Sequence, residues 1–196
     1  MKLLKNDIFT YQLEENVLTS IECKNLIDEF NKFKTAETIV GTINYRDAKI
    51  GLYDDESILL KKVRKIVSIK TNTDIDNQET PISFIKYETG NQYKPHHDFF
   101  GNIENIPQPQ MGDRLITSII YLNDNYIGGE TVFPSENIKI KGRVGDLLFW
   151  KNLNEDRTPN RRTKHAGLPV IDGIKYILVI WIREKKFNND NKKTLL

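Results

Sequence analysis

Two adjacent histidines and an aspartate stand in the stretch "YETGNQYKPHHDFF" (87–100) of a chain that has three histidines in all. Side chains alternate between the two faces of an extended segment, so residues two apart share a face. If 93–98 is extended, His96 and Asp98 point together and His97 points away. His96 and Asp98 are therefore the pair that could chelate one metal ion.

His165, the third histidine, begins the segment "HAGLPVIDGIKYILVIWI" (165–182). Two histidines and one carboxylate on a β scaffold form the facial ligand set of non-haem Fe(II) oxygenases, which keeps coordination positions open for other ligands. The same histidines could also be ordinary surface or hydrogen-bonded residues. Spacing alone leaves both interpretations open.

Lys175 lies in the same segment and adds a positive charge. The Asp172-Gly173 pair between β-branched residues is a hairpin signal, and it predicts that Val170 pairs with Lys175. His165 would then lie about 16 Å away along the neighbouring strand, at about 3.3 Å per residue. Two inward-pointing side chains with a five-carbon dicarboxylate between them would close that gap.

The strand face of Lys175 supports an anionic partner. Lys175 shares this face with Ile177, Val179 and Trp181. Its ammonium group would therefore point where an apolar core is expected, and a buried ammonium group without an anion is costly. The alternative is a lysine at a strand end whose amine extends to solvent.

The elements expected to carry these residues change in type along the chain. The first part is predicted to be helical, with amphipathic segments over 19–33 and 56–69, and a possible capping box from Thr19 to Glu22 begins the first of them. From about residue 81, short β-type runs alternate with turn residues. These runs are 82–87, 114–122, 130–133, 138–150 and 175–182.

This order of elements predicts an antiparallel sandwich or barrel braced by helices. Residues 1–183 are expected to form a single domain, with helical support over about 15–70 and the β core over about 81–183. The segment 99–113 has no periodicity, and we expect a long loop there that could close over a substrate. Residues 184–196 are expected to form a flexible tail.

Composition narrows the class of protein. The 196 residues include 29 basic and 27 acidic side chains, and the net charge of +2 gives no reason to expect a nucleic-acid partner. No apolar run is long enough for a membrane span or a secretory signal, so we expect no membrane association. The single cysteine, Cys23, falls in an apolar helical stripe, where burial is expected. A cytoplasmic location follows as an expectation, in the host cytoplasm if the source is viral.

Four blocks of the sequence together resemble a known family. In chain order they are "YETGNQYKPHHD", "GDRLITSIIYLNDNYIGGETVFP", "GRVGDLLFW" and "HAGLPVIDGIKY". This order is similar to that of prolyl 4-hydroxylases, which are 2-oxoglutarate- and Fe(II)-dependent dioxygenases. The resemblance covers residues 15–183 and implies a mostly β fold with flanking helices around a double-stranded β-helix (jelly-roll, cupin-like) core.

The resemblance also implies roles for the residues singled out above. His96, Asp98 and His165 are implied to bind Fe2+ and to be catalytic. Lys175 is implied to pair with the distal carboxylate of 2-oxoglutarate, and lysine at this position resembles the collagen-type branch of the family.

Four further positions match residues of the family's pocket. Thr131 and Tyr87 match residues that line the 2-oxoglutarate pocket, although β-propensity alone would also explain them. Arg114 and Trp181 match positions near the peptide substrate. A surface arginine and a core tryptophan are the alternative interpretations of these two.

The activity implied is hydroxylation of prolyl residues in a peptide or protein, with O2 and 2-oxoglutarate consumed, succinate and CO2 produced, and ascorbate as a further expected cofactor. The same chemistry could instead act on a free amino acid, a small molecule or another side chain. Two other classes stay open. A zinc hydrolase could use the same ligands, but it would leave Lys175 and Thr131 without a task. A non-catalytic jelly-roll binding module would make the histidines purely structural.

Overall fold

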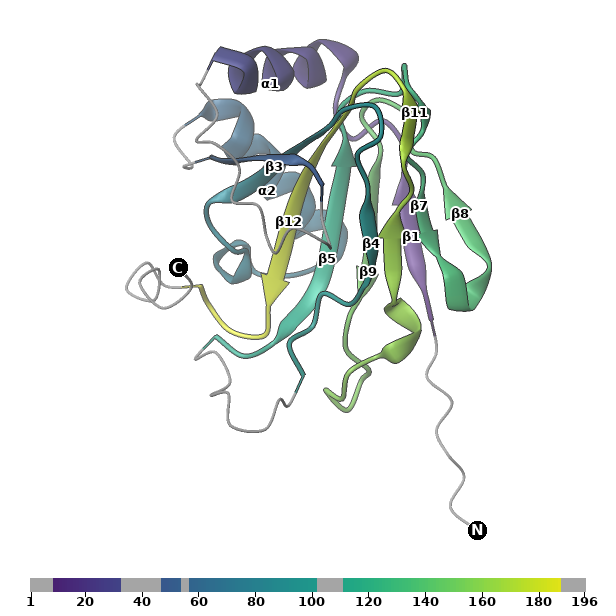
Figure 1. Ribbon diagram of the computed structural model, residues 1–196. Helices are drawn as coiled ribbons and strands as arrows, with labels where there is room; N and C mark the ends of the chain where they lie inside the picture. Colours follow the sequence, from purple (N-terminus) through teal and green to yellow (C-terminus); the bar gives the residue numbers. More distant parts are fainter. Residues whose placement is uncertain (1–8, 33–46, 54–56, 102–110, 188–196) are drawn as a thin grey trace.

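The computed structural model describes residues 9–32, 47–53, 57–101 and 111–187. Two antiparallel sheets pack against each other, and two helices cover the outer face of the larger sheet (Figure 1). The helices are α1 (Ser20–Lys32) and α2 (Ile58–Thr71), with the short 3-10 helices η1 (Ile75–Asn77), η2 (Pro134–Glu136) and η3 (Arg161–Thr163). The predicted mostly β fold with flanking helices is confirmed.

The larger sheet has six antiparallel strands in the order β1-β9-β5-β12-β3-β2. Their bounds are β1 (Tyr11–Glu14), β2 (Lys49–Tyr53), β3 (Ile82–Tyr87), β5 (Arg114–Tyr121), β9 (Leu147–Lys151) and β12 (Lys175–Arg183). The strands β5 and β12 lie at the centre of the sheet and are largely buried, because both faces of the sheet are covered.

The smaller sheet has four strands in the order β4-β10-β7-β8, and a separate two-stranded sheet joins β11 to β6. Their bounds are β4 (Tyr93–His96), β6 (Ile127–Gly128), β7 (Thr131–Phe133), β8 (Ile138–Ile140), β10 (His165–Gly167) and β11 (Val170–Asp172). All of these pairs are antiparallel.

Alternation along β12 assigns its side chains to the two faces of the larger sheet. Leu178 packs in one core cluster with Phe30 of α1 and Val63 of α2. Its neighbour Ile177 belongs to the other cluster, which includes Phe133 of the smaller sheet. The protein thus has one core between the helices and the larger sheet, and a second core between the two sheets.

The sequence correctly predicts the start and the buried face of α1. The backbone N–H of Glu22 donates to the hydroxyl of Thr19 over 3.2 Å, and the backbone N–H of Thr19 donates to the Glu22 carboxylate over 3.0 Å. This reciprocal pair is the expected capping box. Cys23 is fully buried beside Leu26 and Phe30, as the apolar stripe predicts.

The predicted pairing of Val170 with Lys175 is wrong. Gly173 does occupy a turn, with a φ of 83° that suits glycine. However, β11 pairs with β6, so Val170 lies opposite Gly128, and β12 pairs with β3 and β5. A Cβ atom on Gly128 would lie 2.5 Å from the carbonyl oxygen of Pro169. Because Gly128 has no side chain, the backbone at Pro169 can pack closely against β6. The turn at Gly173 therefore connects strands of two different sheets.

The β-type run 138–150 forms two strands in different sheets. Residues of β8 belong to the smaller sheet and residues of β9 to the larger one. Between them, a Cβ atom on Gly142 would lie 2.1 Å from the ring of Tyr121. The backbone N–H of Gly145 donates to the carbonyl of Tyr121 over 2.8 Å. The chain thus passes from one sheet to the other through glycines packed on Tyr121.

Two strands of the larger sheet come from the part of the chain that the sequence pattern presents as helical. They are β1, which pairs with β9, and β2, which pairs with β3. With four and five residues, these strands are too short to show a clear alternating pattern. The first part of the chain therefore supplies strands as well as the two helices.

Most of the expected loop 99–113 and of the expected tail 184–196 lies outside the described residues, which lack 102–110 and 188–196. The described ends of both segments are hydrogen-bonded to each other. The backbone N–H of Glu184 donates to the carbonyl of Asp113, and the N–H of Lys185 donates to that of Met111, each over 3.1 Å. Within the described residues, no helix has the length and apolar character needed to cross a membrane.

Candidate metal and co-substrate site

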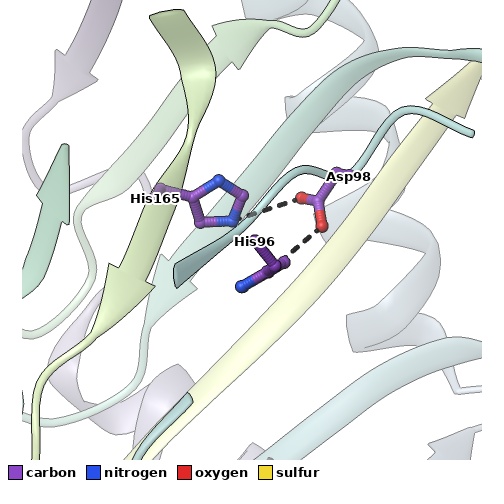
Figure 2. Close-up of side chains that lie close together, drawn as sticks. All are labelled: His96, Asp98 and His165. Atoms are coloured by element: carbon purple, nitrogen blue, oxygen red, sulfur yellow. Dashed lines mark ion pairs between the residues drawn. The ribbon is translucent and has the colours of Figure 1, made fainter. Parts of the chain in front are cut away.

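His96 and His165 are directly paired residues of the adjacent antiparallel strands β4 and β10. Asp98 follows β4 by two residues, and Figure 2 shows the three side chains pointing toward one another. One potential ligand atom from each residue lies within 4.8 Å of the others. Nε2 of His96 is 3.4 Å from Oδ1 of Asp98, and Nε2 of His165 is 3.5 Å from Oδ2. The structure therefore brings together the three side chains that the sequence singles out.

The outer ring nitrogens indicate which tautomer each histidine adopts. Nδ1 of His96 lies 2.8 Å from the carbonyl oxygen of Lys94, and Nδ1 of His165 lies 2.9 Å from that of Thr163. A carbonyl oxygen only accepts, so each Nδ1 carries a proton, and Nε2 of a neutral ring holds a lone pair. Both lone pairs then face the Asp98 carboxylate, which also only accepts. This arrangement is repulsive without a cation, so the three residues fit a divalent metal ion.

The protonation states of the buried residues also suit a metal. Burial lowers the pKa of His165 to about 4, against the opposing effect of Asp98, so its ring is neutral at pH 7. Burial acts to raise the pKa of Asp98, but His165, His96 and Arg114 outweigh it and hold the pKa well below its usual value. A neutral imidazole and an ionised carboxylate are the forms in which these groups bind metals.

His97 points away from the three residues, as the alternation of an extended segment predicts. Its Nε2 lies 3.0 Å from the carbonyl oxygen of Arg161, and its ring lies 4.6 Å from that of Phe99, centroid to centroid. His97 thus contacts η3, the helical turn before β10, and supplies no ligand atom to the cluster.

Lys175 reaches the same pocket from the larger sheet. The pocket is lined by residues of both sheets, among them Lys175, Tyr87, Thr131 and the three residues of the cluster. Lys175 is 3% exposed, and its ammonium donates to the carbonyl of Gly129 over 2.6 Å. Burial lowers the pKa of Lys175 to about 8, although Glu130 acts in the opposite direction. The expected inward orientation of this lysine is confirmed, and extension of its amine to solvent is excluded.

Aromatic rings and hydroxyl groups surround the lysine. The ammonium lies 5.5 Å from the ring centroids of both Tyr87 and Tyr121. The hydroxyl groups of Tyr121 and Thr131 are 2.8 Å apart and both residues are buried. Tyr121 therefore lies beside the predicted 2-oxoglutarate pocket. The apolar residues around it on β5 indicate only a buried side chain and do not predict this place.

Trp181 and Arg114 form a stack at the end of the pocket. Trp181 lines the pocket, and the guanidinium carbon of Arg114 lies 3.8 Å from its ring centroid. Arg114 is held from the other side by Glu79, with hydrogen bonds of 2.8 and 3.0 Å to the two carboxylate oxygens. The indole N–H of Trp181 is buried without a hydrogen-bond partner. Arg114 is thus neither an ordinary surface arginine nor part of the pocket wall.

Comparison with known proteins places this site in a family. A family model described as the 2OG-Fe(II) oxygenase superfamily matches residues 82–183, just over half of the chain. The chain belongs to this superfamily. Membership confirms the predicted dependence on Fe2+ and 2-oxoglutarate. The dependence on ascorbate stays a prediction.

Individual members of the 2OG-Fe(II) oxygenase superfamily align with most of the chain. Prolyl 4-hydroxylase 13 of Arabidopsis thaliana is 29% identical over 199 residues, which cover 88% of this chain and 70% of the relative. The viral collagen prolyl hydroxylase of Paramecium bursaria Chlorella virus-1, solved as a 2OG complex, is 28% identical. Its structure covers 88% of this chain and 95% of its own, with a TM-score of 0.75. A prolyl hydroxylase of Trichoplax adhaerens shares the fold at 19% identity and a TM-score of 0.66.

These structural matches confirm the predicted jelly-roll core. They also agree with the two facing sheets. His96, Asp98 and His165 lie on and beside the smaller sheet, and Lys175 lies on the larger one.

Sequence reasoning missed several residues that hold the oxygenase site in place. The ring of Tyr93 stacks on His96 at 3.6 Å, and Trp150 makes an edge contact with His165 at 4.7 Å. The hydroxyl group of Thr117 donates to the Asp98 carboxylate over 2.7 Å. The alternation of β5 puts Thr117 on the same face as Tyr121, but only the register between strands reveals its partner.

Proposed function

We propose that the protein is a prolyl 4-hydroxylase, an Fe(II)- and 2-oxoglutarate-dependent dioxygenase that hydroxylates prolyl residues in a peptide or protein. The observation that carries the proposal is the buried lysine in the same pocket as the two-histidine, one-carboxylate cluster. The prolyl substrate is supported by two relatives, a plant prolyl 4-hydroxylase and a viral collagen prolyl hydroxylase, each of which aligns with 88% of this chain.

In this proposal His96, Asp98 and His165 hold the iron. The Nδ1–H bonds to backbone carbonyls fix both rings with Nε2 toward the metal position, so the ligands need no reorganisation. When bound, the iron supplies the oxygen activation that couples conversion of 2-oxoglutarate to succinate and CO2 with hydroxylation of the substrate.

Lys175 binds the distal carboxylate of 2-oxoglutarate in this proposal, with Thr131 and Tyr87 beside it. An ammonium that is buried among aromatic rings and apolar side chains interacts with an anion more strongly than one in water. The anion in turn offsets the desolvation of the ammonium. The apolar residues of the pocket wall exclude water from the reacting groups, and they are Ile85, Ile119, Ile177 and Val179.

Trp181 is proposed to contact the peptide near the metal, with Arg114 holding its ring in place. The unpartnered indole N–H of Trp181 is a donor that a substrate carbonyl could use. Arg114, fixed by Glu79 on one side, keeps the indole plane in place by stacking. A proline-rich segment suits such a site because its extended polyproline II form is already ordered before it binds.

The test is an assay of 2-oxoglutarate decarboxylation with Fe(II), in which proline-rich peptides are compared with matched peptides that carry alanine for proline, and with free proline. We expect the proline-rich peptides to stimulate turnover and to gain one oxygen atom by mass spectrometry. Stimulation by free proline alone would redirect the proposal to a small-molecule substrate. Hydroxylation of the peptide in the absence of 2-oxoglutarate would reject the proposal. The cytoplasmic location expected from the sequence stays a prediction, to be checked by cell fractionation.

A further inference from the structure

A buried chain of hydrogen bonds ends on the carboxylate of Asp98. The hydroxyl group of Thr117, on β5, lies 2.7 Å from Oδ2 of Asp98. The side-chain amide of Asn152, which directly follows β9, lies 2.8 Å from the same hydroxyl group. Thr117 is 1% exposed and Asn152 is 0% exposed, so water cannot replace either hydrogen bond. These hydrogen bonds connect β5 and the end of β9, both in the larger sheet, to Asp98 beside the smaller sheet.

Hydrogen-bond chemistry fixes the direction of this chain. An ionised carboxylate only accepts, so the Thr117 hydroxyl must donate to Asp98. The lone pairs of the same hydroxyl are then free to accept, and the amide of Asn152 presents its N–H to them. Asn152 thus keeps the Thr117 proton directed at Asp98. The carbonyl oxygen of the Asn152 amide is buried without a partner, which is a cost that the chain of hydrogen bonds must offset.

We propose that Thr117 and Asn152 are positioning residues for the metal ligand Asp98, with Asn152 acting through Thr117. This inference rests on the proposed role of Asp98 in binding iron. The hydroxyl bond to Oδ2 stops rotation of the carboxylate about its Cβ–Cγ bond. Without it, the two oxygens face the Nε2 lone pairs of His96 and His165, over 3.4 and 3.5 Å, and these repel the carboxylate until a metal ion binds. The hydroxyl bond therefore keeps the oxygens directed at the metal position before the metal arrives.

The test measures metal affinity directly, with Co2+ as a probe that needs no turnover. Thr117→Val removes the hydroxyl group at nearly constant shape, and it should raise the Kd for Co2+ by about 10–100-fold. Thr117→Ser keeps the hydroxyl group and should restore most of the affinity. The visible absorption of bound Co2+, which reports the geometry of its ligands, should change in Thr117→Val and not in Thr117→Ser.

Ser118→Ala is the matched control. Ser118 is the next residue of β5, is 1% exposed like Thr117, and has a hydroxyl group without a hydrogen-bond partner. Its side chain points to the opposite face of the strand. Removing this hydroxyl group should leave both the Kd and the absorption spectrum of Co2+ unchanged. A rise in Kd equal to that of Thr117→Val would show a general effect of altering β5, and would overturn the proposal.

The role of Asn152 is tested by a double-mutant cycle. Asn152→Leu should raise the Kd for Co2+ less than Thr117→Val, and the double variant should bind Co2+ no more weakly than Thr117→Val alone. Additive losses would contradict action through Thr117. If Thr117→Val fails to fold by circular dichroism, the Asn152→Leu variant decides: weaker Co2+ binding supports the proposal, and unchanged binding overturns it.

The outcome also separates this inference from the proposed function. If His96→Ala binds Co2+ as tightly as the wild type, the metal site itself is misassigned. If His96→Ala loses binding while Thr117→Val keeps the wild-type Kd and spectrum, only the positioning role fails.

Discussion

The hydroxyl group of Tyr121, on the larger sheet, lies 2.8 Å from the hydroxyl group of Thr131, on the smaller sheet. Both side chains are buried, and the bond joins the two sheets beside Lys175. A polar contact therefore connects the two sheets beside the pocket, within an otherwise apolar cluster. Burial raises the pKa of Tyr121 well above its usual value, so its hydroxyl group stays protonated and can donate.

Removing either side of this contact should destabilise the protein. Tyr121→Phe or Thr131→Val leaves one buried hydroxyl group without a partner, and each change should lower the free energy of unfolding by about 1–3 kcal/mol. The double variant should lose less than the sum, because the second change removes the orphaned group. Urea denaturation monitored by tryptophan fluorescence measures all three. Strictly additive losses would mean that the hydrogen bond contributes nothing.

The proposed iron ligands should be individually essential. His96→Ala, Asp98→Ala and His165→Ala should each abolish Fe(II)-dependent succinate formation, because each change removes one ligand of the set. His97→Ala is the matched control, since His97 is adjacent in sequence and points away. We expect this variant to retain most of the activity. Succinate formation by any of the three ligand variants would reject the ligand assignment.

Lys175→Ala should act mainly on the requirement for 2-oxoglutarate. Loss of a buried charged partner costs about 2–5 kcal/mol of binding energy, so the KM for 2-oxoglutarate should rise at least about 30-fold. Lys141→Ala is a suitable control: Lys141 also donates to a backbone carbonyl, that of Tyr126, but is exposed. Steady-state kinetics with varied 2-oxoglutarate measure both variants. An unchanged KM in Lys175→Ala would remove the lysine from the co-substrate site.

The pKa of Lys175 predicts a pH dependence for co-substrate binding. Only the ammonium form attracts a carboxylate, and in the ligand-free protein this form is lost above the pKa of about 8. The Kd for 2-oxoglutarate should therefore be flat below about pH 8 and rise by up to about tenfold per pH unit above it. Calorimetric titration of the Mn2+-loaded protein measures this Kd. In Lys175→Arg, whose side chain stays protonated, the rise should disappear.

The same pKa makes a separate prediction for the stability of the ligand-free protein. Between about pH 8 and the ordinary lysine value of 10.5, the unfolded chain binds the Lys175 proton and the folded chain does not. The contribution of this group to the free energy of unfolding therefore increases as the pH rises through that window. The difference between wild type and Lys175→Met, followed by urea denaturation, isolates it. A difference that does not change with pH would contradict the lowered pKa.

Glu79 should matter far more for stability than its single charge suggests. Its carboxylate binds Arg114 through both oxygens, and it also accepts from the fully buried Arg183 over 3.0 Å. Glu79→Gln would leave two guanidinium groups without the carboxylate that they share by hydrogen bonds, at a cost of about 3–5 kcal/mol. Asp28→Asn, which breaks an exposed ion pair with Lys24, should leave stability near that of the wild type. Thermal unfolding of both variants would compare them, and similar melting temperatures would contradict this role.

Local pattern was enough to predict how the candidate side chains point. His96 and Asp98 point together as alternation in an extended segment predicts, although β4 ends at His96. The inward orientation of Lys175 on β12 follows from the same rule. Cys23 and the capping box at Thr19 are equally local. In each case the neighbours within a few residues decide the outcome.

Partners across strands could not be predicted in this way. The Asp172-Gly173 signal correctly indicates a turn, but the choice of partner for β11 depends on the close approach of Gly128 to Pro169. The contact of Thr117 with Asp98 requires the relative placement of β5 and the segment after β4. Such contacts are set by the packing of whole sheets, on which a single stretch of sequence carries no information.

The two ends of the pocket belong to different sheets, with the paired histidines on the smaller sheet and the lysine on the larger one. A dicarboxylate that reaches from one end to the other would contact both sheets and hold them together while it is bound. The two sheets should then separate less often at this end when 2-oxoglutarate is bound. The backbone amides of β7 and β10 should therefore exchange their hydrogens more slowly. The co-substrate would in this way rigidify the wall that shields its own consumption from water.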